Sequence, residues 1–206
     1  MKLRMFDKQA GYSLVEILVV VAIFATVSAI AMPMMGKLFG FYRLSGDARS
    51  VSNAIAVAKM RAAADFSRVR IYVDLSSNSF KMQVWDKTLN SAAGGWRTEG
   101  GVSNLSANVQ FVTTFPMTTP PSGTQTALGQ APACTLDDGT SIGNTACVMF
   151  NSRGVPVDVT FAPTSADAVY LTDYPSTAVY GVTVAATGMI RSWQTPSSST
   201  PHWVLN

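Results

Sequence analysis

The chain is poor in the residues that most catalytic sites use. It contains one histidine, His202, and two cysteines, Cys134 and Cys147, among 206 residues. A Ser/His/Asp set would have to include His202, which lies in a tail rich in proline and serine. No facing pair of carboxylates is apparent from the spacing of the acidic residues. The sequence therefore predicts a protein that is not an enzyme and that has neither a cofactor nor a metal site.

Charge is scarce as well, since charged residues make up 13% of the chain and the formal net charge is +3. Most of this excess lies in residues 1–11, without which the 15 basic and 12 acidic residues fall to 12 and 11. Bulk charge therefore does not predict a basic surface for nucleic acid. The hydrophobic content of 48% is enough for one membrane anchor and one globular domain with a core.

The longest feature that the sequence does contain is the stretch from Gly11 to Met35, GYSLVEILVVVAIFATVSAIAMPMM, within which an apolar run extends from Ile17 to Met35. At ~1.5 Å per helical residue it reaches roughly the ~30 Å of a bilayer core. A secretory signal would have a shorter apolar core followed by a small-residue cleavage site, whereas Gly11 precedes this run. We therefore expect a retained single-pass anchor over residues 12–36. Because basic residues precede it, the N-terminus should be cytoplasmic and the C-terminal part exported.

One acid, Glu16, lies at the start of this run. A carboxylate in lipid costs on the order of 3 kcal/mol unless it is paired, so Glu16 indicates a partner. The residues G-Y-S-L-V-E that end at Glu16 resemble the type III signal of type IV pilins and pseudopilins, in which Phe is more usual than Tyr12. The resemblance implies that residues 1–11 are a leader, which an inner-membrane prepilin peptidase cleaves after Gly11. It also implies N-methylation of Tyr12 and a helix bend at Pro33.

Leader removal would create an α-amino group on Tyr12, with an unperturbed pKa of about 7.7 to 8.0. In lipid this amine and the Glu16 carboxylate of a neighbouring subunit are both unfavourable alone and favourable as a pair. We therefore expect Glu16 to set the depth at which the subunit docks in a helical filament. The alternative is an interfacial glutamate whose side chain reaches the lipid headgroups.

The two cysteines flank the insert TLDDGTSIGNTA and lie in the part that we expect to be exported. Disulfides persist in that compartment, and closing a loop of this size contributes roughly 3 kcal/mol, so we expect Cys134 and Cys147 to be bonded. A metal site would need more Cys or His nearby, and a nucleophilic thiol would need a His partner. Asp137 and Asp138 within the insert are typical of a turn, with calcium binding as the alternative.

After the anchor, apolar residues recur at spacings of three and four, which predicts an amphipathic second half of the helix over residues 37–66. From Val69 the apolar residues recur with a period of two, which predicts β-strands. We therefore expect residues 67–206 to form a β-rich domain, which would lie in the periplasm. Residues 69–75 and 79–85 should form a hairpin, and 109–115 a strand. Turns are expected at 151–154 and 187–188, and loops at 92–101 and 116–132. The predicted fold is α+β and pilin-like, with the helix packed on one antiparallel sheet of roughly five to eight strands.

Two segments, CVMFNSRGVPVDVTF and VYGVTVAATGMIRSWQ, resemble the GspH/FimT branch of the pseudopilins. That resemblance implies a minor pilin or pseudopilin whose partners are other such subunits in a type IV pilus or a type II secretion pseudopilus. The branch often ends with Gly-Arg-x-Arg, but here Met189 stands where the first arginine would be. The alternatives are a signal-anchored periplasmic enzyme and a DNA-binding minor pilin of a DNA-uptake pilus. The candidate DNA contacts would be Arg153, Arg191, Trp193 and Trp203.

Overall fold

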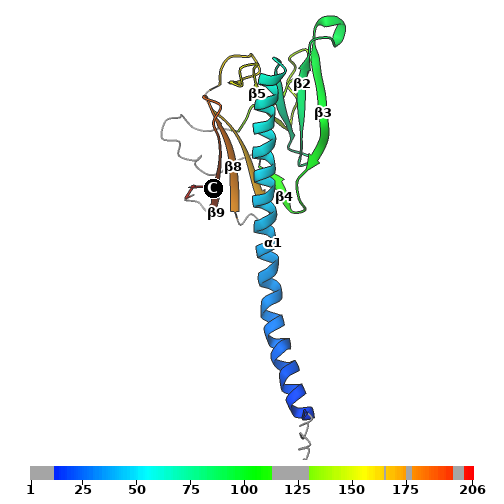
Figure 1. Ribbon diagram of the computed structural model, residues 1–206, viewed down its shortest axis with the longest axis vertical. Coiled ribbons are helices and arrows are strands. Elements are labelled where there is room, and N and C mark those ends of the chain that lie inside the picture. Colours follow the sequence, from blue (N-terminus) through cyan, green and yellow to red (C-terminus); the bar gives the residue numbers. More distant parts are fainter. Residues whose placement is uncertain (1–11, 113–129, 165, 175–177, 197–201) are drawn as a thin grey trace, which may run out of the picture. The chain divides into compact units, whose positions relative to one another are not determined.

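The structure is a computed structural model that describes residues 12–112, 130–164, 166–174, 178–196 and 202–206. It divides into two compact units, residues 1–39 and 40–206. One helix, α1 (Leu14–Ala64), contributes to both units (Figure 1). The boundaries predicted at residues 36 and 66 stay predictions.

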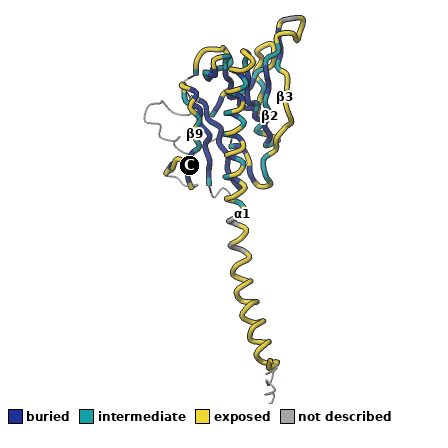
Figure 2. The backbone as a smooth tube through the Cα atoms, viewed as in Figure 1, coloured by how far each residue is buried: buried dark blue, intermediate teal, exposed yellow. Residues whose placement is uncertain are grey.

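The first unit contains the N-terminal part of α1. Its segment Leu14–Met32 is the one helix in the described part of the chain that is long and apolar enough to cross a membrane, with a mean hydropathy of 2.6. No residue of this segment is buried, as Figure 2 shows. The hydroxyl of Thr26 donates a hydrogen bond to the carbonyl oxygen of Ile23 at 2.8 Å. A polar side chain of the segment is therefore satisfied within its own helix, as a lipid environment requires.

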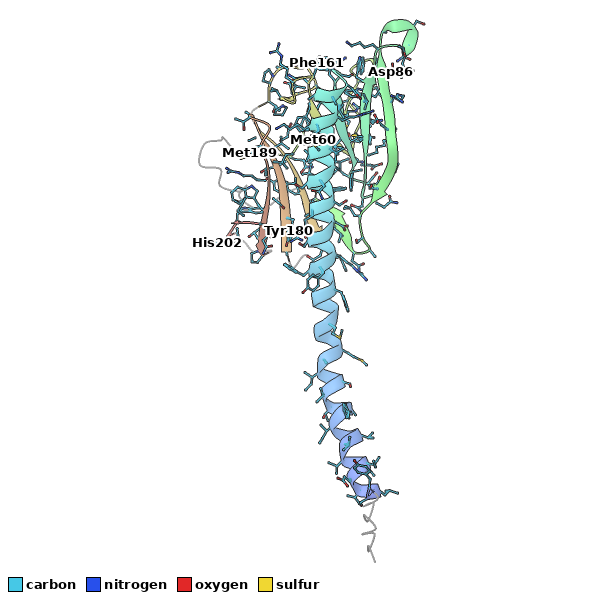
Figure 3. The ribbon with its side chains drawn as sticks, viewed as in Figure 1. Met60, Asp86, Phe161, Tyr180, Met189 and His202 are labelled. Atoms are coloured by element: carbon cyan, nitrogen blue, oxygen red, sulfur yellow. A yellow bond between two sulfur atoms is a disulfide. The ribbon has the colours of Figure 1, made fainter. Side chains whose placement is uncertain are left out.

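In the second unit the remainder of α1 forms the centre of the hydrophobic core. The apolar stripe predicted at spacings of three and four is confirmed, because each of its six members is fully buried: Leu44, Ala48, Val51, Ile55, Ala58 and Ala62. The phenol ring of Tyr180, labelled in Figure 3, has its centroid 6.3 Å from that of Phe41 near the start of this unit.

Within the described residues, ten strands form two antiparallel five-stranded sheets. Sheet A has the order β3-β2-β1-β5-β6 and sheet B the order β10-β9-β8-β7-β4. In sequence order the strands are β1 (Val69–Asp74), β2 (Ser79–Asp86), β3 (Gly95–Asn104), β4 (Val109–Phe111), β5 (Thr145–Phe150), β6 (Pro156–Val157), β7 (Ala166–Asp173), β8 (Ala178–Ala185), β9 (Ile190–Pro196) and β10 (Val204–Leu205). A short 3-10 turn, Asn90–Ala92, precedes β3.

The expectation of a single sheet was wrong, although the α+β class is confirmed. The buried faces of both sheets meet the helix in one cluster, to which sheet A contributes residues such as Ile71 and Val148 and sheet B residues such as Val169 and Val182. Figure 1 shows the two sheets on either side of the C-terminal half of α1. Apolar and polar residues alternate along a strand in the same way whichever sheet the strand belongs to. The strand pattern therefore did not distinguish one sheet from two.

The hairpin of β1 and β2 is confirmed, but the loop predicted over residues 92–101 is wrong. From Gly95 this segment forms β3, which pairs with β2 in a register that places Trp96 opposite Trp85. Gly100 and Gly101 fall where the register shifts between Phe80 and Met82. Glycine in a strand often marks such a bulge, so these residues interrupt a strand rather than prevent it.

The turns predicted at 151–154 and 187–188 are confirmed, and they meet at one side chain of the helix. The Lys59 ammonium donates to the carbonyl oxygen of Gly188 at 2.9 Å. A Cβ atom on Gly188 would lie 2.9 Å from the carbonyl oxygen of Gly154, and Gly188 has a φ of +74°. The two turns, one from each sheet, therefore pack closely only because both positions lack a side chain.

Candidate processing and assembly site at the N-terminus

The helix begins directly after Ser13, which acts as its N-cap. The Val15 N–H donates to the Ser13 hydroxyl oxygen at 3.3 Å, and the Ile17 N–H donates to the Ser13 carbonyl oxygen at 3.2 Å. Serine is a favoured N-cap because its oxygen satisfies an N–H group that has no partner in the first turn. Tyr12 therefore lies outside the helix, with 79% of its surface exposed.

Glu16 lies in the first turn of α1 and is exposed. Its position three residues after Ser13 matches the Ser-x-x-Glu spacing of a capping box, a signal that the sequence analysis missed. A carboxylate at this end also interacts favourably with the helix dipole. A role of Glu16 at the helix start is therefore compatible with a partner in another subunit.

This geometry tests none of the predicted roles at the N-terminus, so cleavage after Gly11, methylation of Tyr12 and the charge pair of Glu16 stay predictions. Gly11 lies outside the described residues. Pro33 lies within α1, and the bend expected there stays a prediction.

The prokaryotic N-terminal methylation motif matches residues 6–32, which include the predicted cleavage point, Tyr12 and Glu16. The N-terminal part of the chain is therefore pilin-like. A sequence search of curated proteins gives no match. Among solved structures, the minor pseudopilin EpsH from the type 2 secretion system of Vibrio cholerae is similar, with 12% identity and a TM-score of 0.43. The similarity covers 76% of this chain and 99% of EpsH, and it is too distant to transfer a function.

The chain has the predicted disulfide, which joins Cys134 to Cys147. Both cysteines are buried, with exposures of 0% and 2%. The Cys134 N–H donates to the Thr145 hydroxyl oxygen at 2.9 Å, and the Ile142 N–H donates to the Cys134 carbonyl oxygen at 2.7 Å. The bond therefore fixes the residue 134–142 segment to the start of β5.

The acidic pair inside the disulfide loop forms a turn, as predicted. The Leu136 N–H donates to the Thr140 carbonyl oxygen at 2.8 Å, and the Thr140 N–H donates to an Asp138 carboxylate oxygen at 2.8 Å. Asp137 accepts hydrogen bonds from the Trp96 N–H and from the Asn90 side-chain amide, each at 2.9 Å. The carboxylates therefore hold the loop in place.

The four candidate DNA contacts have different environments in the structure. Arg153 and Arg191 are exposed, and Arg191 lines a cavity of about 360 Å³ together with Arg49 of the helix. Trp193 and Trp203 are each only 8% exposed and belong to a second hydrophobic cluster on sheet B. The Trp193 indole N–H donates to the Thr183 hydroxyl oxygen at 3.1 Å. Rings so buried do not offer a face on which a base could stack.

Asp167, an acid with a raised pKa, lies at the start of β7. It is 3% exposed, and one of its carboxylate oxygens has no hydrogen-bond partner within the described residues. Burial raises the pKa of Asp167 to about 6, with a smaller contribution from the charge of Asp158 and an opposing one from a Thr164 hydrogen bond. This burial could not be predicted from the sequence, because it depends on the neighbouring strands.

We expect Asp167 to make the folded protein less stable as the pH rises through about 6. The folded state holds this proton more tightly than the unfolded state, whose pKa is about 3.9, so the unfolded state binds fewer protons in this range. The free energy of unfolding should therefore fall by roughly 2–3 kcal/mol between pH 4 and pH 7. Urea unfolding of Asp167→Asn across this range should show a flatter pH dependence than wild type.

Asp74→Asn is the matched control for this experiment. Hydrogen bonds from Ser76 and Ser77 lower the pKa of Asp74, so it titrates below the range of interest. The slope above pH 5 should therefore match that of wild type. An unchanged slope in Asp167→Asn would contradict the assignment.

Proposed function

We propose that this pilin-like protein is a structural minor pilin or pseudopilin, processed by prepilin peptidase and assembled into a type IV pilus or a type II secretion pseudopilus. The observation that carries the proposal is the methylation motif over residues 6–32, which includes the exposed apolar helical segment Leu14–Met32. The minor role rests on the resemblance of two C-terminal segments to the GspH/FimT branch.

Before assembly, the apolar segment anchors the subunit in the inner membrane as a single pass, with residues 40–206 in the periplasm. The exposed Tyr12, outside the first helical turn, is a suitable place for cleavage and methylation because an extended chain fits a peptidase more readily than a helix. The disulfide in the second unit agrees with an oxidising compartment.

During assembly, the fully exposed apolar face of α1 leaves lipid and packs against the helices of other subunits. The amine on Tyr12 then meets the Glu16 carboxylate of a neighbour. Each charge is unfavourable in lipid when it is unpaired, and the two charges neutralise each other. The pair therefore favours one axial position of the subunit in the filament over the others. The partners are therefore the peptidase and methylase first, and other pilin or pseudopilin subunits afterwards.

Mass spectrometry of the protein from its native host tests the processing step. We expect a wild-type N-terminus that starts at a methylated Tyr12. Gly11→Val should retain residues 1–11, because a bulky side chain would block the cleavage site.

The matched control is Gly36→Ala, since a Cβ atom on Gly36 meets nothing within 4 Å. This variant should be processed like wild type. A wild-type protein that keeps its first eleven residues would contradict the proposal and favour a simple signal anchor.

A further inference from the structure

A polar cavity of about 580 Å³ lies on the face of sheet A that points away from the core. Arg70 and Tyr72 on β1 line it, while Ile71 between them is buried in the core beneath the helix. This alternation follows from the period of a strand. Lys81 on β2, Trp96 on β3 and the disulfide loop complete the lining.

Arg70 is a buried cation whose direct hydrogen-bond partners are all neutral. It is only 2% exposed, its Nε donates to the Gln83 amide oxygen, and its Nη1 donates to the Thr135 carbonyl oxygen, each at 2.8 Å. The guanidinium carbon lies 4.0 Å from the Trp96 ring centroid. Within the described residues no carboxylate lies within 4.0 Å of its nitrogens. A buried charge is normally paired, so this cation lacks a counter-ion.

The acids that line the cavity are engaged elsewhere. Both carboxylate oxygens of Asp137 accept hydrogen bonds, from Trp96 and from Asn90. Asp138 accepts the Thr140 N–H within its own turn. Asp137 favours the charged form of Arg70 at longer range, but burial outweighs this and lowers the pKa of Arg70 to about 10. The two acids therefore hold the disulfide loop and leave the cation of β1 without direct compensation.

Lys81 adds a second cation to the same cavity. It lies opposite Tyr72 in the β1–β2 register, and its ammonium nitrogen is 4.7 Å from the Tyr72 ring centroid. Arg70 lies opposite Gln83, so Arg70 and Lys81 are diagonal neighbours on one face, about 7–8 Å apart at the backbone. Lys81 likewise has no carboxylate within 4.0 Å in the part of the chain that the structure describes.

We propose that this cavity binds a ligand through a carboxylate group, which accepts hydrogen bonds from Arg70 and Lys81. A guanidinium matches a planar carboxylate through parallel N–H donors, and a lysine adds a point charge. The volume falls in the range of about 300–1,000 Å³ typical of small-ligand pockets, so it admits more than a bare carboxylate. The carboxylate belongs either to the C-terminus of a polypeptide or to a free organic acid. This inference does not depend on assembly into a filament.

Isothermal titration calorimetry of the full chain in nonionic detergent at low salt tests the proposal. The probes are N-acetyl-Gly-Gly, which ends in a carboxylate, and N-acetyl-Gly-Gly-amide, which is its neutral match. We expect saturable binding of the acid and none of the amide. Acetate as a third probe distinguishes the two sources, because weaker binding of acetate indicates a chain end and equal binding indicates a free acid.

Two lysine variants locate the binding. Lys81→Gln should weaken binding of the acid roughly tenfold through loss of a charge-assisted contact. Lys87→Gln, at an exposed position outside the cavity lining, should leave it unchanged. Thermal melting checks that both variants fold. If either variant does not fold, the comparison of the acid and the amide on the wild-type protein still tests the proposal.

Three results would overturn the proposal. They are equal binding of acid and amide, unchanged binding in a folded Lys81→Gln, and binding of inorganic phosphate with none of either carboxylate.

Discussion

Replacing Glu16 with alanine is expected to reduce incorporation into filaments by about tenfold or more while leaving the protein in the membrane. The apolar helix that we propose as the anchor is unchanged by this substitution. The neighbour's Tyr12 amine, however, would lose its counter-charge in a medium where an unpaired charge costs several kcal/mol. The measurement is the ratio of tagged protein in sheared filaments to that in the inner membrane.

Two further variants test whether the charge of Glu16, rather than its size or a general effect on the apolar segment, causes the defect. Glu16→Gln keeps the size of the side chain but not its charge, and it should be as defective as alanine. Ser28→Ala removes a polar group elsewhere in the same apolar segment and should behave like wild type. Wild-type incorporation of Glu16→Ala would show that this acid acts at the lipid interface or at the helix cap instead of pairing.

Removing the disulfide is expected to destabilise the second unit substantially. The double variant Cys134→Ala/Cys147→Ala should lose roughly 3 kcal/mol, because the unfolded chain regains the freedom of the closed loop. For a protein of this size that corresponds to a fall in Tm of roughly 6–12 °C. The segment that the bond fixes also supplies the Thr135 carbonyl oxygen to Arg70, so the loss should extend to the polar cavity.

Dithiothreitol provides an internal control for this prediction. It should destabilise wild type by a similar amount and have no effect on the double variant. Gly143→Ala in the same loop should melt like wild type, because a Cβ atom there meets nothing within 4 Å. A double variant with the wild-type Tm would show that local packing, rather than the crosslink, holds the loop.

Much of the fold could be predicted because its signals are local. The stripe from Leu44 to Ala62 follows from helical periodicity, and the turn at Gly188 follows from a residue that accepts positive φ. Strand β3 was missed because its stability comes from distant partners. Its Glu99 forms an ion pair with Arg61 of the helix at 2.7 Å, and its backbone pairs with β2. Neither contact is visible in the segment GWRTEGGVSN itself.

The sequence by itself determined the N-terminal methylation motif, because the motif is recognised from residues 6–32 alone. It also determined the apolar segment and the buried stripe of the helix, which depend on local composition and periodicity. Only the tertiary structure decided that the strands form two sheets, that Trp193 is buried and that Arg70 is a covered cation. In the strand VRIYVD, Arg70 has the alternation of a solvent-facing residue. A loop some 65 residues later covers it, and burial of that kind depends on which segments meet in space.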